Sequence, residues 1–168
     1  MGAAGAWILP LRGGYRAAIG EQELVHVIAG APRCFEIPGA PEHCRALFLW
    51  EKEAVPLLDP SVLLAAGPVD VGSGATCVLA YEDPRDGEVR LGGLLLAGVP
   101  RRVTVRDEQW SDLPGHLEPW NDFVLSCFAQ EERPVAVLDL PALFSSSPAG
   151  DAGGARGAAA AGRRPAPD

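Results

Sequence analysis

Short apolar runs separated by turn-forming residues dominate the first 144 positions of the chain. Runs of this length, bounded by glycine, proline or aspartate, predict β-strands joined in hairpins. The predicted hairpins pair residues 6–11 with 15–19, 45–50 with 54–58, 76–81 with 88–96, and 123–128 with 135–138. Many short strands linked by Gly- and Pro-rich turns are typical of barrels, and we therefore expect an all-β fold.

Three segments fit the strand pattern less well. Residues 21–28 have the apolar spacing of a short amphipathic helix, although the β-branched Val27 and Ile28 leave a strand equally open. Residues 30–41 are rich in proline and glycine, so we expect them to be a connection. Residues 108–120 predict an irregular loop.

One stretch of the chain occurs twice, because the pattern of residues 46–64 returns 80 positions later in residues 126–144. In each copy a charged turn is followed by an apolar strand, an aspartate and a short helical turn of apolar residues. Two copies predict two pseudo-symmetric subdomains, since an open array normally needs about three repeats to bury its core. We expect the Gly-rich residues 67–75 to separate the two units.

The aspartates of the two copies, Asp59 and Asp139, are predicted to be helix N-caps. Both stand where a strand runs into a helical turn, and Pro60 follows Asp59 at the favoured first helical position. A general acid and base pair is the alternative, but the shared position favours capping. Loss of Asp139 is expected to cost about 0.5–2 kcal/mol of stability.

The charge of the chain disfavours two kinds of partner. With 22 acidic and 14 basic residues, the formal net charge is −8. Nucleic acids and anionic membranes require a clustered basic face, and only residues 101–106 concentrate arginine. No apolar run approaches the roughly 20 residues that cross a bilayer. We therefore expect neither a nucleic-acid partner nor membrane insertion.

The last part of the chain has a different composition. Residues 145–168 contain no leucine, isoleucine, valine or aromatic residue, so they cannot offset the entropy of ordering. We predict a disordered tail over 145–168 and a folded domain over 6–144.

The cysteines predict no disulfide framework. Cys34, Cys44, Cys77 and Cys127 lie far apart, form no CxxC motif and follow no signal peptide. We interpret them as reduced, buried thiols of a cytoplasmic protein.

No motif for catalysis or for a cofactor is found. The possible metal ligands have no standard zinc spacing; they are His26, Cys34, His43 and Cys44. The environment of Ser73 lacks the outer spacing of a nucleophile elbow. Gly92 and Gly93 lack the Lys-Ser/Thr of a phosphate loop and are interpreted as bulges or kinks that curve the strands. We predict no metal, no cofactor and no enzymatic activity.

Four segments resemble one known family: residues 37–41 (Ile-Pro-Gly-Ala-Pro), 45–48 (Arg-Ala-Leu-Phe), 55–59 (Val-Pro-Leu-Leu-Asp) and 135–139 (Val-Ala-Val-Leu-Asp). With the strand pattern, they resemble the CheW-like family of coupling proteins of bacterial chemotaxis, over about the whole folded body. The resemblance implies two pseudo-symmetric SH3-like five-stranded β-barrels with short helices around a shared core. It also implies a non-catalytic adaptor that joins a methyl-accepting chemoreceptor to the regulatory domain of a CheA-type histidine kinase, itself CheW-like.

The chain departs from the family in the hairpin of the first repeat. The family usually carries Asn-Leu-Arg-Gly there, and these positions are Leu49, Trp50, Glu51 and Lys52. A charge reversal from arginine to glutamate inverts any salt bridge made at that place. Trp50 is either an exposed interface anchor or a residue that closes the barrel. The candidate interface residues are Arg45, Leu49, Trp50, Glu51, Lys52 and Val55.

Three functions remain open at this stage. The first is an adaptor of a flagellar or type IV pilus chemosensory pathway. The second is a degenerate CheW-like module that binds a different protein and does not couple receptors, which Glu51 and Lys52 favour. The third, a small-molecule enzyme on an unrelated β fold, is disfavoured because no polar cluster beyond caps and turns is found.

Overall fold

The strands of the protein form two sheets. The computed structural model describes residues 2–40, 46–64 and 74–145. The first sheet has the order β10 (Val124–Gln130), β11 (Arg133–Leu138), β2 (Arg16–Gly20), β1 (Ala3–Pro10) and β9 (Arg101–Arg106). The second has the order β3 (Leu24–Ala29), β7 (Ala75–Glu82), β8 (Val89–Leu96), β6 (Glu53–Leu58), β5 (Ala46–Trp50) and β4 (Cys34–Glu36). The predicted all-β fold is confirmed.

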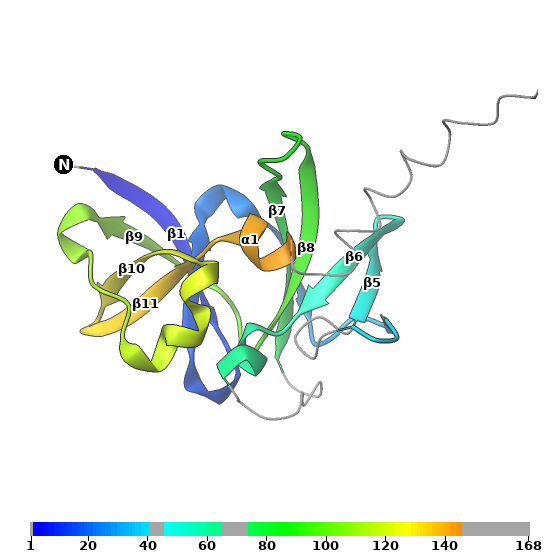
Figure 1. The fold of residues 1–168 in the computed structure, drawn as a ribbon, viewed down its shortest axis with the longest axis horizontal. Coiled ribbons are helices and arrows are strands. Elements are labelled where there is room, and N and C mark those ends of the chain that lie inside the picture. Colours follow the sequence, from blue (N-terminus) through cyan, green and yellow to red (C-terminus); the bar gives the residue numbers. More distant parts are fainter. Residues whose placement is uncertain (1, 41–45, 65–73, 146–168) are drawn as a thin grey trace, which may run out of the picture.

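The helical segments are short. Within the described ranges there is one α-helix, α1 (Leu140–Ser145), and it lies between the two groups of strands in Figure 1. The 3₁₀ segments are η1 (Arg12–Gly14), η2 (Glu21–Glu23), η4 (Pro60–Leu64), η5 (Asp107–Gln109) and η6 (Gly115–Phe123). The region expected to be an irregular loop thus contains 3₁₀ turns, and the segment predicted as a helix or strand is η2 followed by strand β3.

Each sheet closes into an SH3-like barrel, which we call barrel 1 (β1, β2, β9–β11) and barrel 2 (β3–β8). In barrel 1 a single bridge between Trp110 and Phe128 joins the segment after β9 to β10. In barrel 2 the equivalent closure pairs Cys34 of β4 with Phe48 of β5. Because β3 and β4 follow each other along the chain, they share the role of one closing strand, and barrel 2 has six named strands where five were expected.

The path of the chain differs from the expectation. The chain starts barrel 1, builds all of barrel 2, and returns to complete barrel 1. Strands on both sides of residues 67–75 belong to barrel 2, so the prediction that this segment separates the two units is wrong. The reason is a parallel pairing of β6 with β8, in which Leu57 lies opposite Gly93. Such pairing depends on residues distant in sequence, which a local turn signal does not report.

The repeat corresponds to equivalent parts of the two barrels. In barrel 1, β11 pairs in parallel with β2, and Val137 lies opposite Ala18. In barrel 2, Leu57 lies opposite Gly93 in the same arrangement, and Leu57 and Val137 are 80 positions apart. The repeat that the sequence shows is therefore the hairpin and helical turn of each barrel.

The core has three parts. Phe128 and Val135 are buried inside barrel 1, and their counterparts Phe48 and Val55 are buried inside barrel 2. A larger cluster contains residues of both barrels and of the helical segments, including the fully buried Trp120. Alternate residues along each strand face either the interior of a barrel or this shared cluster, as the period of two requires.

Gly92 and Gly93 allow close approach of two aromatic rings to strand β8. A Cβ atom at Gly92 would lie 2.3 Å from Phe144 Cζ, and one at Gly93 would lie 2.5 Å from Phe48 Cε1. The pairing of β7 with β8 runs without a register shift past both glycines. Of the predicted bulge or kink, the bulge is therefore wrong, and the close packing of the two rings explains why glycine is needed at both positions.

Side-chain hydrogen bonds and a ring stack connect the two barrels. The guanidinium of Arg12 in η1 donates from Nε to Asp59 Oδ2 at 2.6 Å, just before η4. The indole of Trp120 in η6 donates from Nε1 to the carbonyl oxygen of Pro60 at 3.0 Å. Tyr81 of β7 stacks on Phe144 of α1 with ring centroids 5.3 Å apart. These contacts tie the helical segments of one barrel to the other.

Candidate protein-interaction surface

The predicted interface residues lie at one hairpin of barrel 2. Leu49 and Trp50 end strand β5, and Glu51 and Lys52 form the turn that leads into β6. Arg45 lies outside the described residues. We call Leu49, Trp50, Glu51 and Lys52 the β5–β6 corner.

Val55 does not belong to this surface. Its side chain is 0% exposed and packs beside Phe48 inside barrel 2. Val55 is therefore a core residue, and it cannot touch a partner directly. The period of two along β6 explains the difference, since the strand turns alternate side chains inward.

Trp50 is partly buried, and it has features both of an interface anchor and of a residue that closes the barrel. Its ring lies 4.7 Å from that of His26, measured between ring centroids, at an interplanar angle of 33°. It also packs against the cluster inside barrel 2. The tryptophan thus covers the end of the barrel, and its exposed part remains at the corner.

The turns of the two repeats share an unusual backbone. Glu51 and Lys52 have φ values of 47° and 73°, and their counterparts Glu131 and Glu132 have 52° and 61°. Two successive positive φ values in a two-residue loop are the geometry of a type I′ turn, which Asn-Gly and Gly-Gly favour. Both turns therefore hold non-glycine side chains in left-handed backbone, which strains them.

Replacing Glu131-Glu132 by Asn-Gly is expected to stabilise the protein by about 1 kcal/mol, because it relieves the left-handed strain. Urea unfolding of the variant and the wild type measures the difference. The control is Ala-Ala at the same positions, which removes both charges but keeps the strain. An equal gain from Ala-Ala would attribute the effect to charge instead.

An apolar ridge extends from the corner over the outer face of barrel 2. Leu49 is 62% exposed and Phe35 is 50% exposed. Between them lies Leu47, which pairs with Phe35 across the sheet and is two residues from Leu49 on the same face. We call Phe35, Leu47 and Leu49 the Leu49 ridge. A single exposed apolar side chain is ordinary on a protein surface, whereas the Leu49 ridge groups neighbouring apolar side chains.

The repeated aspartates make the contacts of caps. Asp139 Oδ1 accepts a hydrogen bond from Ala142 N at 3.1 Å at the start of α1. Asp59 Oδ1 accepts from Ser61 N at 3.0 Å, while its other oxygen is held by Arg12. Their carboxylates therefore have structural partners in each barrel.

Two of the cysteine thiols have raised pKa values. Burial raises the pKa of the Cys77 thiol to about 12, and partial desolvation raises the pKa of Cys34. Cys34 is exposed, so the expectation that it is buried is wrong, whereas Cys77 and Cys127 are buried. High pKa values disfavour the thiolate that catalysis or metal binding needs.

The described part of the chain contains no group of three His, Cys, Asp or Glu side chains that could hold a metal ion. His43, Cys44 and Ser73, which were considered as ligands or nucleophile, lie outside the described residues. Over the described ranges, no helix is both long and apolar enough to cross a bilayer.

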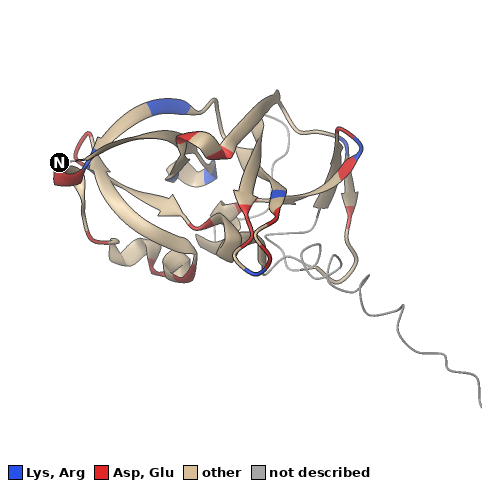
Figure 2. Cartoon of the chain, turned by 90° about the horizontal axis from the view of Figure 1, so that it is seen from above, with Lys and Arg blue, Asp and Glu red and all other residues tan. Residues whose placement is uncertain are grey.

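The basic residues of the described ranges are dispersed. Figure 2 shows the blue segments as short pieces separated by tan and red ones. In the arginine-rich strand β9, Arg101 forms a salt bridge with Glu131 and Arg102 forms one with Glu21. The strand that concentrated arginine in the sequence is thus partly neutralised by its neighbours.

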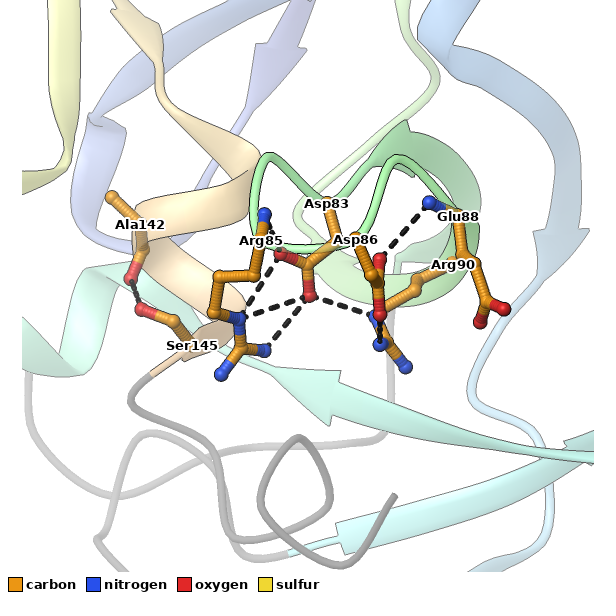
Figure 3. A network of polar contacts seen from close by, with 7 residues as sticks. All are labelled: Asp83, Arg85, Asp86, Glu88, Arg90, Ala142 and Ser145. Atoms are coloured by element: carbon orange, nitrogen blue, oxygen red, sulfur yellow. Dashed lines mark hydrogen bonds and ion pairs between the residues drawn. The ribbon is translucent and has the colours of Figure 1, made fainter. Parts of the chain in front are cut away.

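A network of charged side chains lies in the turn between β7 and β8. Asp83 is 3% exposed and accepts hydrogen bonds from Arg85 and from Arg90 Nε, the latter at 2.8 Å. Figure 3 shows this turn beside the end of α1, where Ser145 Oγ donates to the carbonyl oxygen of Ala142. The hydrogen bonds from Arg85, followed by those from Arg90, lower the pKa of Asp83 below its ordinary value.

The lowered pKa of Asp83 predicts that the protein loses stability in acid. The pKa of Asp83 is lower in the folded state than in the unfolded state. The ionised carboxylate therefore contributes its full stabilisation above the unfolded-state pKa, and this stabilisation is lost as the pH falls toward the folded-state pKa. The difference in Tm between the wild type and Asp83→Asn is expected to be constant from pH 7 to about pH 5 and to shrink below about pH 4. A difference that does not change over this range would contradict the assignment.

The fold and the corner define a class of protein, namely a pair of SH3-like barrels fused through a shared core. The family model described as CheW-like domain matches residues 16–147. The chain belongs to this CheW-like family.

A solved structure has the same fold. It is the scaffolding protein TtCheW from Thermoanaerobacter tengcongensis, with a TM-score of 0.66 and 14% sequence identity. The similarity covers 85% of this chain and 93% of that chain. The search of curated proteins found no match.

Proposed function

We propose that the protein is a non-catalytic cytoplasmic adaptor that couples chemoreceptors to a CheA-type histidine kinase. The observation that carries the proposal is the match to the CheW-like domain over residues 16–147, together with the complete pair of barrels. The structural neighbour described as a scaffolding protein supports the same class. The partners are the regulatory domain of the kinase and a methyl-accepting receptor of a flagellar or pilus pathway.

The side chains of the described ranges support a role without catalysis. The carboxylates of Asp59 and Asp139 have capping partners, and the thiol of Cys77 has a raised pKa. Binding, in contrast, requires exposed apolar surface with polar neighbours, which the Leu49 ridge and the adjacent turn provide.

Calorimetric titration of the full chain with the regulatory domain of the cognate kinase tests the proposal. Saturable binding with a micromolar Kd or better is expected. A folded chain that does not bind the domain would refute the adaptor function. It would favour the alternative, a CheW-like module for another protein, which the replacement of Arg-Gly by Glu51-Lys52 supports.

The receptor side has a separate test at the β5–β6 corner. We expect Glu51→Arg to change receptor affinity and to leave kinase affinity unaltered, because the reversed charge alters one exposed contact. The matched control is Glu132→Arg, which makes the same charge change in the equivalent turn of barrel 1. Unchanged receptor affinity in Glu51→Arg would remove the corner from the receptor interface. Arg45, Leu49, Trp50 and Lys52 remain proposed members of that interface.

A further inference from the structure

An open pocket with a volume of about 640 Å³ lies at one end of barrel 1. Its walls come from all five strands of the barrel and from the segment after β9, and most of the lining residues are small or apolar. Val105 and Val137 line the pocket and also pack against the cluster inside barrel 1. The pocket is therefore the open end of the barrel interior, and its volume is in the range of small-molecule sites.

A glycine leaves this end of barrel 1 without a side chain that barrel 2 has. The parallel pairs place Ala18 of barrel 1 and Gly93 of barrel 2 at equivalent positions. Two residues further along each strand, Gly20 therefore corresponds to Leu95. Leu95 packs against the cluster inside barrel 2, whereas Gly20 lines the pocket. Any residue can adopt the φ of −62° at Gly20, so the backbone does not require a glycine there.

Trp110 provides an aromatic wall of the pocket on a backbone that is held in place. Its backbone N donates to the carbonyl oxygen of Asp107 at 3.3 Å, and the residue forms the bridge to Phe128 of β10. The next residue, Ser111, donates from its backbone N to the carbonyl oxygen of Cys127 at 2.9 Å. The Trp110 side chain is nevertheless 66% exposed, which is unusual for so large an apolar group. A fixed and exposed indole can stack on a flat ring at a small cost in conformational entropy.

The polar lining residues indicate what the second half of a ligand is. Arg106 lines the pocket, and it is the one arginine of β9 for which no salt bridge is found over the described ranges. Asp107 also lines the pocket, but its Oδ2 already accepts a hydrogen bond from Gly2 N at 2.7 Å. Ser126 pairs with Val137, whose side chain packs inside the barrel, so the serine side chain is on the same face. A guanidinium and a hydroxyl beside an apolar hollow complement a carboxylate carried on an apolar ring.

We propose that barrel 1 binds a small aromatic carboxylate in this pocket. The ring of the ligand stacks on Trp110 and fills the space that Gly20 leaves open. The carboxylate of the ligand accepts hydrogen bonds from Arg106. The site lies in the other barrel from the β5–β6 corner, and binding of the ligand does not depend on a kinase or a receptor.

NMR titration of the full chain with indole-3-acetate tests the proposal. This probe combines a flat apolar ring with one carboxylate, whereas indole lacks the carboxylate and acetate lacks the ring. Indole-3-acetate is expected to shift the indole N–H signal of Trp110 saturably, with a Kd below about 1 mM, and to leave the signals of Trp50 and Trp120 in place. Indole is expected to bind at least threefold more weakly, and acetate is expected to give no saturable shift. No saturable shift at Trp110, or equal shifts at all three tryptophans, would overturn the proposal.

Two substitutions test the two halves of the site separately. Gly20→Leu fills the hollow and is expected to abolish saturable binding, and a Cβ atom at Gly20 meets no atom closer than 3.4 Å, at Glu23. Arg106→Gln is expected to weaken binding of indole-3-acetate about threefold to tenfold and to leave binding of indole unchanged, because only the carboxylate loses its donor. Wild-type affinity for indole-3-acetate in either variant would refute the assigned site.

Two more variants separate binding from folding and from general stickiness. Trp110→Ala removes an exposed side chain, so it is expected to fold and to weaken binding at least tenfold, measured on the backbone amide signal of Gly20. Leu125→Ala changes another 66% exposed residue of β10 that does not line the pocket, and it is expected to bind like the wild type. Equal affinities of these two variants would contradict the proposal.

A protein side chain in the pocket is the competing occupant, and the same spectra distinguish it. Without the probe, the Trp110 signal is expected to stay constant from micromolar to millimolar protein concentration. A signal that moves with protein concentration and does not respond to indole-3-acetate would show that the pocket is a protein contact and would overturn the proposal.

Discussion

Replacing Arg12 by alanine is expected to lower the free energy of unfolding by about 3 kcal/mol. The side chain of Asp59 is 3% exposed, and its Oδ2 atom is held by the Arg12 guanidinium. Without Arg12 the carboxylate remains buried with Ser61 as its other donor. Removal of one member of a buried ion pair costs more than the pair is worth, because the remaining charge is no longer compensated.

Equilibrium unfolding in urea measures this loss of stability, and two further variants serve as comparisons. Arg12→Ala combined with Asp59→Asn is expected to recover part of the stability, because the double variant no longer buries an unpaired charge. Arg102→Ala removes an arginine of an exposed salt bridge with Glu21 and is expected to cost about 0–1 kcal/mol. If Arg12→Ala lowers the free energy of unfolding as little as Arg102→Ala does, the ion pair of Arg12 with Asp59 stabilises the protein no more than an exposed salt bridge.

Trp120→Ala is expected to destabilise the protein by about 3–5 kcal/mol. The side chain is 1% exposed, contacts the ring of Tyr15 at a centroid distance of 6.2 Å, and donates to the Pro60 carbonyl oxygen. The substitution leaves a large cavity in the cluster shared by the barrels and removes the indole hydrogen bond to the Pro60 carbonyl oxygen.

The matched control for this variant is Trp110→Ala. Trp110 is 66% exposed, so its removal is expected to change the free energy of unfolding by less than about 1 kcal/mol. Trp120→Phe keeps most of the ring and removes the donor, and it separates the hydrogen bond from the packing. Equal unfolding midpoints for the two alanine variants would show that the shared cluster does not depend on Trp120.

The local elements were predictable because their signals are local. Alternating apolar residues and turn chemistry place the hairpins within a few residues of their positions, and the repeat identifies the two equivalent hairpins. Segment 21–28 was ambiguous because β-branched residues fit both states, and pairing of His26 with Val78 in the sheet decides it.

The candidate surface was predictable only in part. The family pattern directs attention to the β5–β6 corner, and Leu49, Glu51 and Lys52 are indeed exposed there. Val55 was misplaced because a residue in a strand is exposed or buried according to its face, which the sequence of a short apolar run does not reveal. The pocket at one end of barrel 1, lined by Gly20 and Trp110 among others, was not predicted, because its walls come from strands that only the sheet order brings together.

By itself, the sequence determined the all-β class, the duplicated hairpin, the capping aspartates and the family resemblance. The tertiary structure alone decided that strands β1 and β2 join β9–β11 in barrel 1, that Arg12 meets Asp59, and that Trp120 reaches Pro60. These contacts join residues 47 and 60 positions apart. Turns and hairpins follow from neighbouring residues. The faces of short apolar strands, the parallel registers and the contacts between barrels are selected by the burial of the whole chain, which no local pattern encodes.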